Sequence, residues 1–196
     1  WSIETGRIRD NPMRGVKGYN AAADRRHERR CLAPEELGRL VAAAESGPER
    51  FGMTGPLRAM AYRLAAATGL RVNELRALTR ESFDLAGDEP TVSLPASAAK
   101  NGKAAEQPIP LAMVPLLRPW LARQAPRVPV LPLDHQTAKA IKADLADAGI
   151  AYRTDDGIAD FHSLRAFYVS ALVRAGADIK EVQHLARHAA PQTTLN

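Results

Sequence analysis

The segment His162-Ser163-Leu164-Arg165-Ala166-Phe167 opens an apolar stretch with helical spacing near the carboxyl end of this 196-residue chain. A histidine and an arginine three positions apart lie on one face of a helix. A second histidine, His188, follows in the next apolar segment, and Arg71 begins a helix far upstream. Together these side chains could hold a phosphodiester, so the segment predicts both a helical core and an anion site.

Helical patterns also fill most of the chain before this segment. Apolar residues recur at helical spacing, glycines such as Gly69 and Gly149 end the runs, and Asp178 is placed to cap the last one. Two prolines, Pro115 and Pro119, are expected to kink or split one helix. The predicted helices cover residues 34–46, 56–68, a short run from 71, 111–124, 136–148, 162–175 and 178–187.

One short region in the middle of the chain favours β-structure. Thr91-Val92-Ser93-Leu94 alternates in polarity, and residues 107–111 form a second short run that contains two prolines. Asn101-Gly102 between them is a strong turn signal. We therefore predict a β-hairpin with Lys100 and Lys103 near its tip, in a fold that is mostly α with a small antiparallel β-sheet.

The composition limits the classes of function. A net charge of +5 is compatible with a nucleic-acid partner, and a solvated positive face explains it as well. A single cysteine, Cys31, excludes a disulfide framework within the chain and indicates a reducing compartment such as the bacterial cytoplasm. No apolar run is long enough to span a bilayer and no signal peptide opens the chain. We expect no cofactor and no membrane partner.

The residues before Pro34 differ in composition from the rest of the chain. Gly6, Gly15 and Gly18 punctuate a segment that is typical of the tail of a preceding helix followed by a linker. The linker carries four arginines, Arg25, Arg26, Arg29 and Arg30. These form either a solvated linker or an arm that lies along a phosphate backbone. Trp1 is not a natural start residue, so we expect further residues upstream.

Arg71 has the best local setting for an anion. It follows the break at Gly69 at a helix start, where backbone N–H groups and the helix dipole favour negative charge. Its guanidinium adds a fork for two phosphate oxygens. Glu74 is expected to orient an arginine or to cap the turn. Taken alone, Arg71 is more simply explained as a surface side chain.

The histidines also have simpler explanations. His162 could be the cap residue of its helix, and Arg165 would then lie in the first turn, where a buried guanidinium requires an anionic partner. His184 and His188 have the i, i+4 spacing of metal ligands. Because no third ligand is evident nearby in the sequence, we expect no metal site.

In this order and at these separations, the motifs resemble the tyrosine recombinase (phage integrase) catalytic domain. The resemblance covers roughly residues 31–196 and is carried by residues 68–75, 162–167 and 182–188, followed by 191–196. It implies that residues 1–18 are the end of a DNA core-binding domain and that 19–30 are a basic linker. Residues 31–196 would then be the integrase catalytic domain without its extreme carboxyl end.

The resemblance also implies roles for single residues. Arg71 and Arg165 would clamp the scissile phosphate. His162 would belong to the His-x-x-Arg box, and His188 would be the second histidine. Lys100 matches the hairpin lysine that protonates the leaving 5′ oxygen, with Lys103 as its rival. The further DNA contacts that we expect are Arg25, Arg26, Arg29, Arg30, Lys103 and Arg187.

Enzymes of this family attack the phosphodiester with a tyrosine and form a 3′-phosphotyrosine link. In the family that tyrosine follows the second histidine closely, and the corresponding position here lies just beyond Asn196. Tyr168 is expected to pack in the core instead. We therefore expect this chain to bind DNA weakly and not to cleave it.

One departure from the family is Arg187, since a glycine usually precedes the second histidine. We expect its side chain to touch DNA or to point outward. In the family the segment after the tyrosine joins protomers, so we expect a homotetramer on double-stranded DNA for the full-length protein and a monomer for this chain. The open alternatives are a non-catalytic DNA-binding relative, a type IB topoisomerase-like relaxase and a plain helical DNA-binding regulator.

Overall fold

The computed structural model describes residues 2–16, 28–98, 102 and 104–187, and α-helices are its main regular secondary structure. The fold is mostly α with small antiparallel sheets, as predicted. Each predicted helix is confirmed, and residues 111–124 divide into a 3₁₀ turn and an α-helix. The helices are α1 (Pro34–Ser46), α2 (Gly55–Thr68), α3 (Val72–Arg76), α4 (Val114–Ala122), α5 (Thr137–Asp147), α6 (Ser163–Arg174) and α7 (Ile179–Leu185), with 3₁₀ turns at Arg80–Ser82 and Leu111–Met113.

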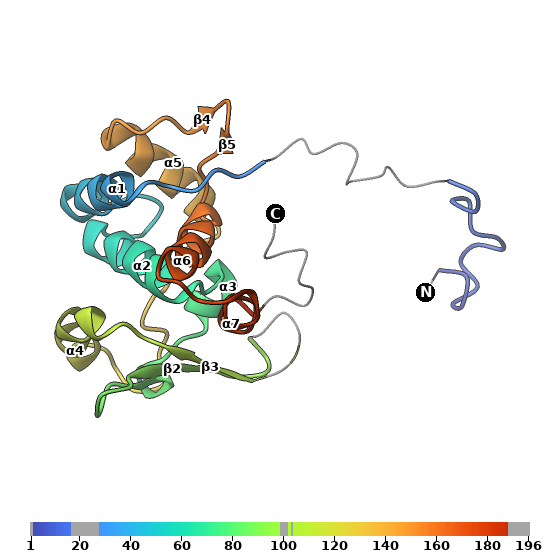
Figure 1. The fold of residues 1–196 in the computed structure, drawn as a ribbon. Coiled ribbons are helices and arrows are strands. Elements are labelled where there is room, and N and C mark those ends of the chain that lie inside the picture. The colour runs from blue at the N-terminus through green and yellow to red at the C-terminus, as the bar shows by residue number, and fades with distance from the viewer. Residues whose placement is uncertain (1, 17–27, 99–101, 103, 188–196) are drawn as a thin grey trace.

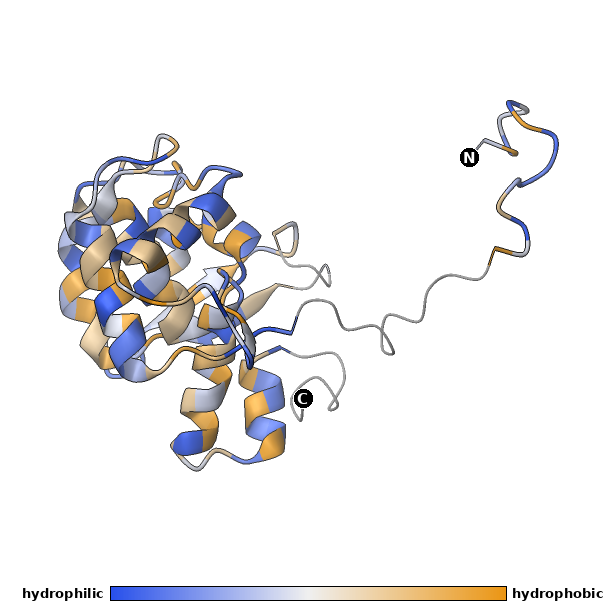
Figure 2. Ribbon diagram, turned by 90° about the horizontal axis from the view of Figure 1, so that it is seen from above, coloured by the Kyte–Doolittle hydropathy of each residue, from blue (hydrophilic) through white to orange (hydrophobic). Residues whose placement is uncertain are grey.

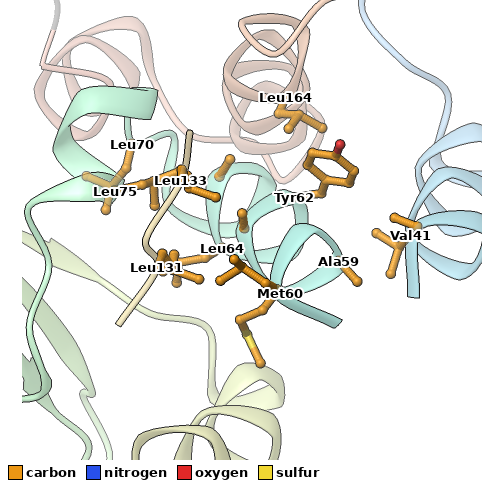
Figure 3. Packing of buried hydrophobic residues seen from close by; sticks show 14 of the residues in the cluster. Val41, Ala59, Met60, Tyr62, Leu64, Leu70, Leu75, Leu131, Leu133 and Leu164 are labelled. Carbon is orange, nitrogen blue, oxygen red and sulfur yellow. The ribbon is translucent and has the colours of Figure 1, made fainter. Parts of the chain in front are cut away.

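Helix α2 lies at the centre of the fold, between α1 and α6 (Figure 1). It is buried on nearly every side because small alanines alternate with large apolar residues. Close packing of this kind gives the core most of its stability. Figure 3 shows the side chains that meet around it: Ala59, Met60 and Leu64 of α2, Val41 of α1, Leu164 of α6, and Leu131 and Leu133 from the stretch that precedes α5.

A three-stranded antiparallel sheet lies beside the helices, in the order β1 (Phe83–Asp84), β2 (Thr91–Leu94) and β3 (Ala105–Pro108). The predicted hairpin is thus confirmed as β2 and β3, and Val92 and Leu94 face the core. Strand β1 was not predicted, because two residues carry no alternation. The predicted second run, 107–111, was placed too late, since a 3₁₀ turn already begins at Leu111.

The connection between β2 and β3 is longer than a tight turn. Leu94 pairs with Ala105, so residues 95–104 join the two strands. The predicted tip residues Lys100 and Lys103 fall in this connection and lie outside the described residues.

A second, two-stranded ribbon forms between α5 and α6, from β4 (Arg153–Thr154) and β5 (Gly157–Ile158). Residues 28–30 lie alongside β5: the Ile158 N–H donates to the Glu28 carbonyl at 2.8 Å, and the Arg30 N–H donates to the Ile158 carbonyl at 3.2 Å. The end of the predicted basic linker is therefore packed onto the helical body.

Residues 2–16 form turns and bends, with no helix or strand among them. Gly6 has a φ of +68°. Its N–H donates to the Ile3 carbonyl at 3.0 Å, and the Arg7 N–H donates to the Ser2 carbonyl at 2.9 Å. These two bonds around a left-handed glycine are the pattern that closes the carboxyl end of a helix. The local geometry therefore agrees with the helix-tail interpretation of this segment.

Polar and apolar residues are mixed along the helices rather than gathered into one long apolar run (Figure 2). Within the described part of the chain, no helix is both long and apolar enough to cross a membrane.

A buried ion pair joins α2 to α5. The Arg58 Nε and Nη2 atoms donate to the Asp144 carboxylate at 2.8 and 3.0 Å, and the Tyr62 hydroxyl donates to it at 2.7 Å. Arg58 is 1% exposed and Asp144 is fully buried. Burial and the neighbouring Asp144 carboxylate raise the pKa of the Tyr62 hydroxyl well above its usual value. This polar centre was not predicted, because only the fold brings the three side chains together.

Replacing Arg58 with alanine should lower the free energy of unfolding by roughly 3–5 kcal/mol, because the buried Asp144 carboxylate would keep only its longer ion pair with Arg50, at 3.3 Å. Arg63→Ala on the same helix is the matched control. Its ion pair with Glu45 is partly exposed, at 2.6 Å, so its loss should change the stability by less than about 1 kcal/mol. Urea unfolding followed by circular dichroism measures both, and equal losses would contradict the assignment of Arg58 to a buried pair.

Candidate functional site

Three segments of the chain meet at one pocket of about 480 Å³. They are the turn between α2 and α3, the start of α5 and the start of α6, and Ala98 also lines the pocket. Arg71, His162 and Arg165 all line the pocket. The structure therefore brings together the predicted catalytic residues that it describes, and the other two, Lys100 and His188, lie outside the described residues.

The turn after α2 depends on Gly69. Its φ of +66° is a left-handed conformation that ends the helix. A Cβ atom at this position would lie 2.4 Å from the Cδ1 atom of Tyr168. The Tyr168 ring is buried there, as predicted, and its hydroxyl accepts a hydrogen bond from Gln107 Nε2 at 2.7 Å. The sheet and α6 thus support the turn that precedes Arg71.

Arg71 is the first residue before α3, and Glu74 holds it in place. The Arg71 N–H donates to Glu74 Oε2 at 2.7 Å, and Arg71 Nη1 donates to Oε1 at 3.0 Å. Glu74 therefore both caps the turn and orients an arginine, as predicted. The Arg71 side chain is 31% exposed, so its guanidinium is accessible from the pocket.

His162 stands at the N-cap position immediately before α6, as the cap interpretation has it, but its side chain does not cap the helix. Its side chain makes no capping hydrogen bond. Asp160 Oδ1 instead accepts from the backbone N–H groups of His162 and Ser163 at 2.8 and 3.2 Å. Asp160 was not singled out in the sequence, although an aspartate just before a helix is a common capping signal. Because Asp160 caps the helix, the His162 imidazole is not needed there. It lines the pocket instead.

The pKa of His162 is lowered below its usual value. Partial burial at the pocket wall is the largest cause, and the positive charges of Arg29 and Arg165 add to it. Arg29 is held nearby by an ion pair of 2.9 Å with Asp160. His162 is therefore neutral near pH 7, with one ring nitrogen able to donate and the other able to accept.

Arg165 is a buried cation whose partners are carbonyl groups. It is 3% exposed, and its Nη1 donates to the Gly69 carbonyl at 2.6 Å while Nη2 donates to the Ala186 carbonyl. Among the described residues no ion pair involves Arg165. Burial, and then the positive charges of Arg71 and Arg187, lower its pKa to about 10. It stays charged at neutral pH and lacks a counterion.

Arg187 turns inward rather than outward. Its Nη2 atom donates to Glu74 Oε2 at 2.7 Å and Nη1 to Oε1 at 3.3 Å, and its side chain is 12% exposed. Burial alone would raise the pKa of Glu74, but the hydrogen bonds from Arg187 and from the Arg71 N–H hold it below its usual value. Glu74 is thus a buried anion shared by two arginines, a pairing that the sequence did not indicate.

The other predicted DNA contacts differ in exposure. The side chain of Arg29 is 47% exposed beside the pocket. Arg30 is 9% exposed and binds both carboxylate oxygens of Glu36, at 2.8 and 3.0 Å, which leaves it little surface for a phosphate. Arg25 and Arg26 lie outside the described residues. Within the described ranges, no three His, Cys, Asp or Glu side chains are grouped closely enough to hold a metal ion.

Gly69→Ala should destabilise the protein much more than Gly149→Ala. Both glycines have nearly the same positive φ, +66° and +65°, but only the Cβ at 69 meets the Tyr168 ring, and nothing lies within 4 Å at 149. The shared backbone strain amounts to about 1–2 kcal/mol, and the clash adds roughly 1–3 kcal/mol. Thermal or urea unfolding measures the stability of both variants, and the difference between them gives the cost of the clash. Equal losses of stability would rule out close packing of Tyr168 on the turn.

The His162 imidazole should titrate below 6.5, the value of an unperturbed histidine. Proton NMR of the ring signals measures the midpoint, and the signal that disappears in His162→Gln assigns it. Arg29→Ala should raise the midpoint, because it removes a positive charge and frees the Asp160 carboxylate. A midpoint at or above 6.5 in the unmodified protein would contradict the described pocket environment.

The comparison with known proteins gives the family. The sequence pattern described as the phage integrase family matches residues 30–196. No curated protein sequence matches the chain.

Several solved structures share the fold. A lambda integrase (75–356) dimer bound to a COC′ core site has a TM-score of 0.67 and 20% identity, over 98% of this chain and 68% of that one. The XerH recombinase bound to palindromic difH, in a post-cleavage complex, has a TM-score of 0.65 and 20% identity, over 95% of this chain and 54% of that one. The catalytic domain of bacteriophage HP1 integrase has a TM-score of 0.60 and 19% identity, over 86% of each chain.

The chain spans about half the length of the two XerH chains, 54% and 49%. The family pattern matches most of the sequence, and the fold is shared as well. Together these two findings identify the family. The chain belongs to the phage integrase family, and its fold is that of a tyrosine recombinase catalytic domain.

Proposed function

We propose that the protein is a site-specific recombinase that breaks and rejoins double-stranded DNA through a 3′-phosphotyrosine link. One observation carries the proposal. The Arg165 guanidinium is buried without an ionic partner among the described residues, beside the pocket that Arg71 and His162 also line. A buried charge without a counterion is costly, and a DNA phosphate would supply the missing negative charge.

The two arginines act as a clamp on the scissile phosphate. The carbonyls of Gly69 and Ala186 fix the orientation of Arg165, and Glu74 fixes that of Arg71. Each fork keeps further N–H groups for the non-bridging phosphate oxygens. Negative charge grows on these oxygens as the nucleophile adds to phosphorus, so donors that are already in position lower the barrier.

The nucleophile in this proposal is a tyrosine encoded just after Asn196. Its hydroxyl loses a proton and forms a P–O bond, while the bond from phosphorus to the 5′ oxygen breaks. Lys100, or its rival Lys103, gives a proton to the leaving 5′ oxygen. Rejoining is the reverse: a 5′-hydroxyl attacks phosphorus and releases the tyrosine. The phosphotyrosine link preserves a phosphodiester bond, so no cofactor is needed.

The histidines complete the phosphate site. A neutral His162 can donate one hydrogen bond to the phosphate or accept a proton from the nucleophile, which a protonated imidazole could not accept. His188, the second histidine of the family pattern, is proposed to help position the phosphate.

DNA is proposed to run across the pocket mouth. Arg29 lies there and is half exposed. We propose that Arg25 and Arg26 of the linker 19–30 extend the phosphate contacts, that residues 1–18 belong to a preceding core-binding domain, and that 31–196 form the catalytic domain. The lambda integrase and XerH structures contain their DNA sites, which supports double-stranded DNA as the partner. A homotetramer on DNA is proposed for the full-length protein.

The full reading frame should form a covalent protein–DNA adduct on a nicked duplex. The duplex is first selected from a random library by binding, and the adduct is measured on a denaturing gel. Arg71→Ala and Arg165→Ala should each slow adduct formation by roughly 10²–10³-fold, because each removes a donor to the developing charge. Arg63→Ala is the control and should keep the full rate, because Arg63 does not line the pocket and is paired with Glu45.

The absence of any adduct with DNA that is demonstrably bound would reject the recombinase proposal. A stop codon or a phenylalanine in place of the expected tyrosine would point to the non-catalytic DNA-binding relative. Relaxation of supercoiled DNA without sequence preference would point to the type IB topoisomerase-like alternative. Unchanged specific DNA binding and biological activity in both arginine variants would favour the plain DNA-binding regulator.

A further inference from the structure

Arg187 has a backbone conformation that suits glycine. Its side chain contacts Glu74, the residue that orients Arg71. Its φ is +52°, a left-handed conformation that costs a residue with a Cβ atom about 1–2 kcal/mol. Even so, the side chain is folded inward onto the buried carboxylate of Glu74. Strain of this kind persists only where the contacts around it are favourable. The contacts of the Arg187 guanidinium with Glu74 supply that compensation.

Two arginines share the single negative charge of Glu74. Arg71 uses Nη1, at 3.0 Å from Oε1. Arg187 places Nη2 at 2.7 Å from Oε2 and Nη1 at 3.3 Å from Oε1. With one arginine alone, the carboxylate would neutralise Arg71 and hold its guanidinium back from a substrate. The second arginine balances the carboxylate and leaves the positive charge of Arg71 in excess.

The same turn also contacts the second arginine of the clamp. Ala186 precedes Arg187, and its carbonyl accepts a hydrogen bond from Arg165. The end of α7 therefore holds Arg165 directly and Arg71 through Glu74. Arg187 does not line the pocket itself. Its contacts are with the group that orients a clamp residue and not with the space where a phosphate would lie.

We propose that Arg187 is a positioning residue for the phosphate clamp: it shares the Glu74 carboxylate with Arg71, and so leaves the Arg71 guanidinium, still oriented by Glu74, with positive charge in excess to bind the anion. This inference rests on the proposed function and refines it. It differs from a role for Arg187 in touching DNA, because the guanidinium is committed to a buried carboxylate and is 12% exposed.

The decisive variant is Arg187→Gly, which removes the fork and relieves the backbone strain. In the full reading frame it should slow adduct formation on the nicked duplex by roughly 10–100-fold. Any loss of affinity for the same duplex should be no larger than that of Arg71→Ala, because the contact that is weakened is that of Arg71. Arg187→Lys should not restore the rate, because an ammonium cannot bind both carboxylate oxygens.

Two further variants exclude a general structural effect. Arg127 is an exposed arginine with a φ of +59°, so Arg127→Gly makes the same substitution in a similar backbone and should leave the rate unchanged. Adding Glu74→Gln to Arg187→Gly should recover part of the lost rate, since a neutral amide no longer competes for Arg71. A role limited to packing would give no recovery.

A second measurement does not depend on DNA cleavage. Binding of inorganic phosphate to this chain can be followed through the NMR signals of His162. Arg187→Gly should weaken phosphate binding, and the added Glu74→Gln should restore part of it. If the unmodified protein forms no adduct, the recombinase proposal fails while this measurement still tests Arg187.

Three results would overturn the inference. They are a normal rate and normal phosphate affinity in Arg187→Gly, no recovery on adding Glu74→Gln, or a loss of DNA affinity larger than that of Arg71→Ala, which would indicate a phosphate contact made by Arg187 itself.

Discussion

The buried guanidinium of Arg165 is the interaction on which the site depends. It comes from α6 and donates to the carbonyl that ends α2 and to the carbonyl that ends α7. A charged group this deep is stable only if its N–H groups are satisfied and its charge is matched. The carbonyls satisfy two of its N–H groups, and among the described residues Arg165 forms no ion pair. The fold therefore presents an anion site that is incomplete by itself.

The rest of the structure keeps that site rigid. The closely packed helix α2 ends at Gly69, and the Tyr168 ring fills the space where a side chain would lie. Gln107 ties that ring to the sheet. At the other end of α2, Arg58 and Asp144 make a buried polar tie to α5. Because α2 is held at both ends, the turn that carries Arg71 keeps a defined position relative to Arg165.

The carboxylates at the site balance only part of the positive charge of the arginines. Asp160 is matched by Arg29, and Glu74 is shared by Arg71 and Arg187. The arginines outnumber the carboxylates, so the pocket carries an excess of positive charge. Burial first, and then the crowding of like charges, lowers the pKa of His162 and of Arg165. An anionic ligand would relieve this repulsion, which is the physical basis for proposing a phosphate.

The amino-acid sequence by itself determined the helices, the β2–β3 hairpin, the family, and Arg71, His162 and Arg165 as candidate site residues. These depend on local signals, namely apolar periodicity, glycine breaks and short motifs. Only the tertiary structure decided that Asp160 rather than His162 caps α6, and that Glu74 is shared with Arg187. The physical reason is that a buried side chain takes its partners from whichever segments pack against it, and 113 positions separate Arg187 from Glu74 along the chain.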